Sequence, residues 1–236
     1  MSTYYGTAIT TQGLTLLLDA ANPKSYPGSG TVWTDLAQGL VFNSSGTTNA
    51  WGTVGGARAL TFNGSGYWEC SSGFGRVPLG GDCTIILMLY EVGHATRRTI
   101  FEKAGTSYQS YEQEIAMTWE TNQSMSYYSR QSPAYDVAST EACDTNKWNM
   151  IAIKMSTGLT ATARTGFNSK NGSAWSANYT SNSNVALVQA GAIRVGTGYA
   201  GTVDNGSISM VACYNRMLTD AEIYQNYLAW RTRHGI

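Results

Sequence analysis

Charged residues are scarce in this chain. Asp, Glu, Lys and Arg make up 13% of its 236 residues, which is about half of their usual share in soluble proteins. The formal net charge is zero, and no run of like charge is longer than the pair Arg97–Arg98. Because a protein that binds nucleic acid is expected to gather Lys and Arg on one face, the sequence predicts no nucleic-acid partner.

Segments that enter or cross a membrane are also missing. No apolar stretch approaches the roughly 18 residues that a membrane-spanning helix needs. The opening MSTYYGTAIT has neither the basic region nor the apolar region of a secretory signal peptide. We therefore expect no membrane insertion and no secretory signal.

The usual catalytic motifs are absent as well. Glucanases with a β-sandwich fold carry their acids on one strand as a Glu-x-Asp-x-x-Glu-like run, whereas here Glu112 and Glu114 are followed only by Glu120. The two histidines, His94 and His234, are accompanied by no G-x-S-x-G nucleophile motif. The sequence predicts that the protein is not an enzyme, with a glycan hydrolase as the enzymatic alternative.

The four cysteines include no C-x-x-C pair. Cys83 and Cys213 lie in the strand-like runs CTIILMLY and ISMVACYN, where a reduced cysteine behaves as a small hydrophobic residue. We therefore expect buried thiols, with one disulfide as the alternative, and no zinc site.

Short β-like runs, each bounded by Gly, Asn, Ser or Pro, recur along the chain. CTIILMLY is apolar at almost every position, which indicates a central strand covered on both faces. Strands are expected at Leu14–Asp19, Ala59–Phe62, Tyr67–Cys70, Cys83–Tyr90, Thr99–Lys103, Glu112–Glu120, Ser124–Ser129, Trp148–Met155, Thr160–Phe167, Ala192–Gly196 and Ser207–Tyr214. Together they predict an all-β, two-sheet antiparallel sandwich.

The C-terminal segment breaks this pattern and predicts one α-helix, at about 219–234. Thr219 and Glu222 have the spacing of a capping box at its start, and Gly235 can end it. An apolar stripe then follows, formed by Ile223, Tyr227 and Trp230. This stripe either packs on a sheet of the same chain or docks onto a partner.

Aromatic residues are candidates for binding, because their rings can stack on sugars, although most are expected to pack in the core. The Ser-, Asn- and Gly-rich stretch Asn168–Asn184 is interpreted as a long surface loop, so its Trp175 and Tyr179 are candidate carbohydrate- or partner-binding residues. Tyr127 and Tyr128 are further candidates, since adjacent strand residues point to opposite faces. A glycan site and a protein contact remain open alternatives.

Calcium is the one cofactor that the sequence leaves open. Sandwich loops can assemble a calcium site from scattered oxygen ligands, but no D-x-D-x-D spacing marks such a loop here. We predict no cofactor, with Asp19 and Asp204 as the main candidate calcium ligands. The other oxygen donors that we consider are Asn22, Asp35 and Asp82.

Asp19 follows the run Leu16–Leu18 and opens the segment DAANPKSYPGSG. Pro27–Gly28 suits the central pair of a type II turn. We expect a loop of defined conformation that is held in place by Tyr26 and Trp33. In this loop, Asp19 accepts hydrogen bonds from backbone N–H groups at the end of the strand.

Four segments carry a family resemblance: GLTLLLDAANPKSYPGSGTVWTDL, ALTFNGSGYWE, NKWNMIAIKM and GSISMVACYNRMLTDAEIYQNYLAWRTRHGI. They resemble laminin-G-like domains of the concanavalin A-like lectin-glucanase superfamily, of the type found in structural proteins of tailed bacteriophages, marine phages in particular. The resemblance implies a jelly-roll sandwich and a role on the virion, where such domains decorate capsids or form parts of fibres, and some bind carbohydrate. It transfers no catalytic residue and no set of calcium ligands.

The sequence thus predicts an N-terminal arm, residues 1–12, and a single domain, residues 13–236. The leading functional hypothesis is a non-enzymatic virion structural protein, assembled in the host cytoplasm. It would decorate the capsid through contacts with the major capsid protein, with other virion proteins or with copies of itself. The alternative is a carbohydrate-binding receptor or adhesin module of a tail or head fibre, with a host-surface glycan as its partner.

Overall fold

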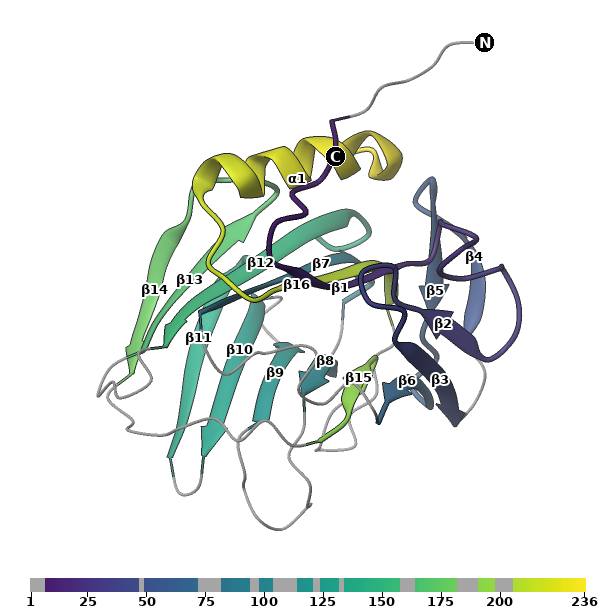
Figure 1. Cartoon of the computed structure of the whole chain (residues 1–236), viewed down its shortest axis with the longest axis horizontal. Helices are drawn as coiled ribbons and strands as arrows, with labels where there is room; N and C mark the ends of the chain where they lie inside the picture. The colour runs from purple at the N-terminus through teal and green to yellow at the C-terminus, as the bar shows by residue number, and fades with distance from the viewer. Residues whose placement is uncertain are drawn as a thin grey trace.

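A computed structural model of the chain describes residues 7–46, 49–71, 82–93, 98–103, 114–120, 124–131, 134–157, 164–181, 191–197 and 206–236. In it, two antiparallel β-sheets face each other and one helix lies on the outside of one sheet (Figure 1). The predicted two-sheet sandwich with a C-terminal helix is confirmed.

The sheets have eight strands each. Sheet A contains β1 (Leu14–Asp19), β4 (Ala50–Val54), β5 (Ala57–Thr61), β7 (Cys83–Tyr90), β12 (Trp148–Thr157), β13 (Arg164–Lys170), β14 (Ser176–Ser181) and β16 (Ser207–Tyr214). Sheet B contains β2 (Val32–Thr34), β3 (Val41–Gly46), β6 (Gly66–Cys70), β8 (Arg98–Lys103), β9 (Glu114–Trp119), β10 (Ser124–Gln131), β11 (Ala134–Ala142) and β15 (Ile193–Val195). The helix α1 is Asp220–His234.

Strands that are far apart in the chain are neighbours in both sheets. Sheet A has the order β14-β13-β12-β7-β16-β5-β4, with β1 also paired to β16, and sheet B has the order β11-β10-β9-β8-β15-β6-β3-β2. In sheet B the short strand β15 therefore lies between β8 and β6, and it joins the two halves of the sheet.

Three predicted strands, β1, β7 and β16, have the expected bounds. The prediction of a loop over Asn168–Asn184 is wrong, because β13 and β14 form a hairpin there. Asn171 and Gly172, with φ of 50° and 73°, make the turn. The strand β14 lies at the edge of sheet A, where backbone hydrogen bonds to β13 hold it in place. Its sequence is mostly polar, so it lacks the apolar pattern from which a strand is predicted. The short or polar strands β2, β3, β4 and β11 escaped prediction as well.

The strand β7 is buried on both faces, as its apolar sequence predicts. Cys83, Ile85, Leu87 and Leu89 belong to the main core between the sheets, whereas Ile86 and Met88 belong to a second core under the helix. Sheet B contributes large side chains to the main core, among them Trp33, Phe42, Trp68, Phe101, Met117 and Trp119. All four cysteines are buried thiols, as expected.

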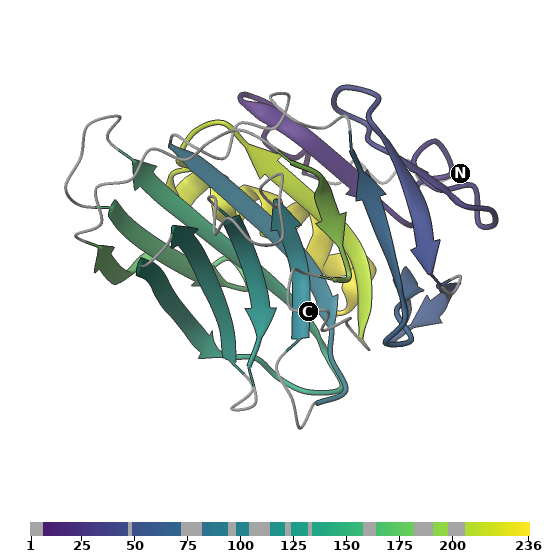
Figure 2. The ribbon, with the colours of Figure 1, turned by 90° about the horizontal axis from the view of Figure 1, so that it is seen from below.

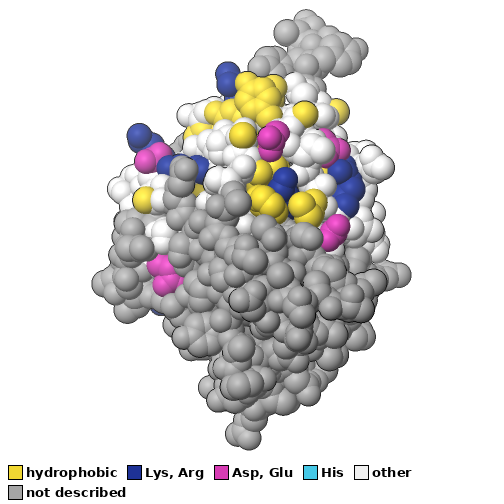
Figure 3. Space-filling view, turned by 90° about the vertical axis from the view of Figure 1, so that its left-hand side faces the viewer, with side chains coloured by type: hydrophobic (Ala, Val, Ile, Leu, Met, Phe, Trp, Pro, Cys, Tyr) yellow, Lys and Arg dark blue, Asp and Glu magenta, His cyan; other side chains and the backbone are white. Residues whose placement is uncertain are grey.

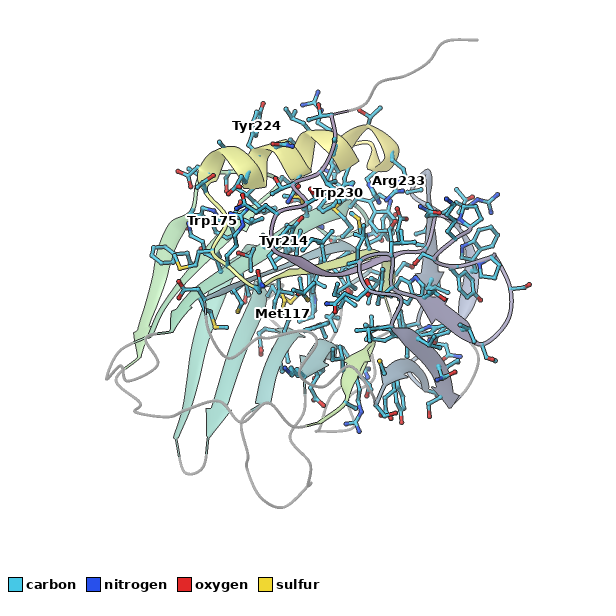
Figure 4. All side chains as sticks on the ribbon, viewed as in Figure 1. Met117, Trp175, Tyr214, Tyr224, Trp230 and Arg233 are labelled. Carbon is cyan, nitrogen blue, oxygen red and sulfur yellow. The ribbon has the colours of Figure 1, made fainter. Side chains whose placement is uncertain are left out.

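Helix α1 covers the outer face of sheet A. Thr219 is its N-cap and forms the predicted capping box with Glu222, and Gly235 ends it in the left-handed conformation. Ile223 and Trp230 are buried and Tyr227 is partly buried in the second core. In Figure 4, Trp230 points from the helix toward the sheet and Tyr224 points away from it. The predicted stripe therefore packs on the chain's own sheet, and its surface is used within the domain rather than offered to a partner.

The chain before β1 is tied to this helix. The Thr10 backbone N–H donates to Asn226 Oδ1 (2.8 Å), and the Tyr214 hydroxyl donates to the Thr10 carbonyl (2.9 Å). Asn226 Nδ2 donates to the Tyr214 hydroxyl (3.1 Å), which closes a buried network. The end of the predicted N-terminal arm thus docks on the domain. In the described part of the chain, no helix is long and apolar enough to span a membrane.

Candidate functional site

Helix α1 covers the outer face of sheet A and does not cover the outer face of sheet B. Figure 2 views the molecule from the side opposite the helix, and α1 lies behind the strands in that view. On β6, Trp68 is fully buried in the main core. Because side chains alternate along a strand, its neighbours Tyr67 and Glu69 point to the outer face, and both are partly exposed.

Polar side chains from four strands form a line across this face. Strand register places Asn43 opposite Glu69, Glu69 opposite Arg194, and Arg194 opposite Glu102. We call these four residues the Arg194 row. They come from β3, β6, β15 and β8 in that order, so β15 positions the central arginine between two acids.

Arg194 holds both acids of the row. Its Nε donates to Glu69 Oε2 at 2.7 Å, and its Nη1 donates to Glu102 Oε1 at 3.2 Å. The exposed fractions of the three side chains are 30% for Arg194, 29% for Glu69 and 0% for Glu102. The row therefore has an accessible acid, an accessible arginine, and a buried acid that anchors the arginine.

The charges of the row stabilise one another. Burial by itself lowers the pKa of Arg194, but the hydrogen bond to Glu69 and the charges of Glu102 and Glu69 outweigh it, so the pKa is raised. Tyr67 stands two positions before Glu69 on β6, so strand alternation places it on the same face as the row. The side chains of the row itself comprise two carboxylates, one guanidinium and one amide. Among the described residues, the site thus combines an aromatic ring, hydrogen-bond donors and anionic acceptors on the outer face of sheet B.

Sequence reasoning did not identify this site. The residues of the site stand in short segments whose sequences are typical of ordinary strands: Tyr67, Glu69, Glu102 and Arg194. In addition, about ninety residues of chain separate β8 from β15. The alternation of side chains in the β6 sequence GYWEC is the one local signal, since it places Tyr67 and Glu69 on one face of the sheet and Trp68 on the other. No local pattern indicates that Arg194 pairs with both acids.

The tyrosine candidates Tyr127 and Tyr128 lie on β10. The backbone register continues the row from Glu102 to Ala116 on β9, and from Ala116 to Tyr128. The side chains of Tyr127, Tyr128 and Tyr179 lie outside the described residues. The strand register thus aligns the Tyr128 position with the cross-strand row of positions that contains Arg194.

Trp175 lies just before β14 rather than in a long loop. Its backbone N–H donates to Asp220 Oδ1 at 3.0 Å, and its ring is partly buried against the second core. Figure 3 shows this side of the molecule, with apolar side chains gathered near the helix and charged ones between them. Trp175 therefore helps to join α1 to the β13–β14 hairpin.

The ring face of Trp175 is already occupied. Lys154 Nζ lies 4.6 Å from the Trp175 ring centroid and 5.1 Å from that of Phe167, and it donates to the Leu218 carbonyl at 3.1 Å. Burial lowers the pKa of Lys154, and the charge of Asp220 opposes this effect. A cation of the same chain thus occupies one face of the Trp175 ring, where it would compete with a stacked sugar.

The candidate calcium ligands mostly bind the backbone. Asp19 Oδ1 accepts the N–H of Ala21 at 2.9 Å, as predicted, and its Oδ2 pairs with Arg233. Asp35 accepts the backbone N–H groups of Leu17, Ala37 and Gln38. These carboxylates already have partners that a calcium ion would have to displace.

Two of the three remaining calcium candidates, Asn22 and Asp82, lie in the described part of the chain. Asn22 accepts the N–H of Lys24, Asp82 is exposed, and Asp204 lies outside the described residues. Among the residues that the structure describes, no group of three or more His, Cys, Asp or Glu side chains is arranged to hold a metal.

In the loop after Asp19, residues 28–30 form a bend. Gly28 has φ of 96°, which is compatible with the second central position of the predicted type II turn. Tyr26 and Trp33 are buried, and each packs edge-on against Trp68, with ring centroids 5.6 Å and 6.0 Å apart. The loop is therefore pinned on the back of the strand that carries Tyr67 and Glu69.

The fold is shared with several solved structures. Domain 4 of AbnA, a GH43 extracellular arabinanase from Geobacillus stearothermophilus described in complex with arabinotriose, matches with a TM-score of 0.64 and 16% identity over 92% of this chain and 98% of that one. The receptor-binding domain of botulinum neurotoxin type G matches with a TM-score of 0.62 and 11% identity, over 92% of this chain and 51% of that one.

Trypanosoma rangeli sialidase matches with a TM-score of 0.64 and 15% identity over 97% of this chain. This chain spans only 35% of the length of the sialidase. No protein-family model matches the sequence, and no curated protein matches it either. At these identities the likeness shows the fold alone, a two-sheet β-sandwich.

Proposed function

We propose that the chain is a carbohydrate-binding domain that holds its ligand on the outer face of sheet B. The observation that carries the proposal is the Arg194 row beside Tyr67. A sugar presents C–H groups on its ring faces and hydroxyls that both donate and accept hydrogen bonds. Tyr67 supplies an amphipathic ring, Arg194 supplies donors, and Glu69 and Asn43 supply acceptors.

The match to domain 4 of the arabinanase supports this proposal. That domain is described in complex with arabinotriose, and the match covers 98% of it. A β-sandwich of this size is therefore a suitable scaffold for oligosaccharide binding. The low identity means that the residues which bind must be argued from this chain itself.

We propose binding without hydrolysis. Hydrolysis by a pair of carboxyl groups needs one of them protonated, as the general acid. Arg194 bonds to both Glu69 and Glu102, so both carboxylates are already held in ion pairs within the chain. We propose that these two acids orient the arginine rather than act on a glycosidic bond.

We further propose the surface of a bacteriophage virion as the setting, on the resemblance of the opening and closing segments. Within that setting, the structure supports the receptor role over capsid decoration. The apolar stripe that would have docked the helix on a shell protein packs on sheet A instead. A host-surface glycan is thus the partner that we propose.

Calorimetric titration with a panel of oligosaccharides tests the function. We expect Arg194→Ala and Tyr67→Ala each to weaken binding at least about tenfold, as loss of a charged or aromatic anchor does. The matched control is Arg58→Ala, which removes an exposed arginine that also lies beside an aromatic ring, 4.4 Å from the Trp51 centroid, but on sheet A. Absence of any binding by the wild-type protein across the panel would overturn the proposal.

A further inference from the structure

We infer that the Arg194 row selects uncharged glycans and rejects acidic ones, an inference that rests on the proposed carbohydrate site. The row holds two carboxylates and one guanidinium, and each carboxylate is hydrogen-bonded to that guanidinium. The positive charge that an acidic sugar would seek is therefore already shared between two acids of the chain.

Within the described part of the chain, Arg194 and Glu69 retain polar groups that can bind hydroxyls. Arg194 uses Nε and Nη1 for Glu69 and Glu102, which leaves its Nη2 amino group to donate to a ligand. Glu69 uses Oε2 for Arg194, so its Oε1 can accept. A donor next to an acceptor matches a pair of neighbouring sugar hydroxyls, each of which donates and accepts.

A sugar carboxylate fits this arrangement poorly. To reach Arg194 it must either displace Glu69, which leaves a partly buried acid without its partner, or lie beside Glu69 with like charge. The Glu102 side chain is fully buried beside the arginine, so water does little to screen its charge. Either arrangement makes the binding free energy of an acidic sugar less favourable, whereas a neutral sugar can bind without it.

The described basic residue next to Glu102 along β8 points away from the row. Lys103 follows Glu102, but it is buried on the core side, near the thiols of Cys213 and Cys83. Burial lowers the pKa of Lys103 to about 8, so part of the population is neutral near that pH. On β6, the outward neighbour of Glu69 is Tyr67, which has no basic group.

A ligand pair that differs only in charge provides the test. The probes are a trimer of galacturonic acid and the same trimer as its neutral methyl ester, together with neutral arabinotriose. We expect the wild-type protein to bind the neutral probes at least about tenfold more tightly than the acidic trimer, as a like-charge contact implies. Glu69→Gln should narrow this ratio toward one, because it removes the charge and keeps the acceptor.

The control variant is Asp144→Asn, which removes an acid that is 55% exposed and pairs with Lys170 elsewhere. It should leave the ratio unchanged. If neutral probes bind but the acidic trimer binds equally well, or if Glu69→Gln leaves the ratio unchanged, the selectivity is refuted while carbohydrate binding stands. If no sugar binds, the proposed function fails, and this inference fails with it.

Discussion

Asp19 and Arg233 form an ion pair, with Oδ2 and Nη1 3.0 Å apart, although 214 positions separate them in the chain. Asp19 ends β1, and Arg233 lies in the last turn of α1. The pair therefore ties the helix to sheet A at the end opposite the capping box. Both side chains are partly buried, with exposed fractions of 14% and 32%.

Removing this pair should lower the free energy of unfolding. We expect Asp19→Asn and Arg233→Ala each to cost about 1 kcal/mol, the upper range for partly exposed pairs. Asn at position 19 keeps an oxygen for the Ala21 N–H, so the loop is retained. In urea unfolding, the double variant should lose less than the sum of the single losses. Strict additivity would show that the two side chains act independently.

The capping box at Thr219 should contribute a similar amount. The Thr219 hydroxyl accepts the Glu222 N–H, and Glu222 accepts the Thr219 N–H at 2.9 Å. We expect Thr219→Ala to cost about 1 kcal/mol, while Thr219→Ser should be close to neutral because it keeps the hydroxyl. Chemical unfolding measures both variants. An equal loss in the two would assign the effect to the lost methyl group rather than to the cap.

His234 should make stability depend on pH. Burial, chiefly, lowers its pKa to about 4, with the Arg233 charge adding to this effect and the Trp230 carbonyl and Asp19 opposing it. The unfolded chain gains a proton near the ordinary pKa of about 6.5, whereas the folded chain gains it only near 4. The stability that the neutral ring confers is thus present above pH 6.5 and is lost as the pH falls from 6.5 toward 4.

Thermal unfolding of the wild type and of His234→Gln across this range tests the prediction. His234 Nδ1 donates to the Trp230 carbonyl at 2.8 Å, and the ring lies edge-on against Trp148, 4.8 Å between centroids. The advantage of the wild type should shrink by up to about 3 kcal/mol as the pH falls from 6.5 to 4. A constant difference between the two proteins would show that the ring titrates normally in the fold.

Trp175→Ala should reduce stability and leave carbohydrate binding unchanged. The ring packs on the second core and carries Lys154 on its face, so its removal should cost about 2–3 kcal/mol, somewhat less than for a fully buried aromatic residue. Chemical unfolding and oligosaccharide titration on the same sample separate the two effects. A tenfold loss of sugar affinity in a stably folded variant would restore Trp175 as a binding residue.

Local patterns in the sequence were sufficient to predict the elements whose structure depends on residues close to one another in the chain. The capping box of α1 lies within four residues, and the burial of β7 on both faces follows from its unbroken apolar run. The positive φ of Gly28 follows from the conformational freedom of glycine after a proline. The edge strand β14 was missed because backbone hydrogen bonds to β13 hold it and its side chains are mostly polar.

By itself, the sequence determined the β-sandwich class, the terminal helix, the buried thiols and the role of Asp19 at the strand end, because periodicity, capping and turn chemistry act over a few residues. Only the tertiary structure decided the site. It placed β15 between β6 and β8, which sets Arg194 between Glu69 and Glu102, and it placed Lys154 on the ring of Trp175. Both depend on which distant strands become neighbours, and that choice follows from burying the whole core rather than from any local pattern.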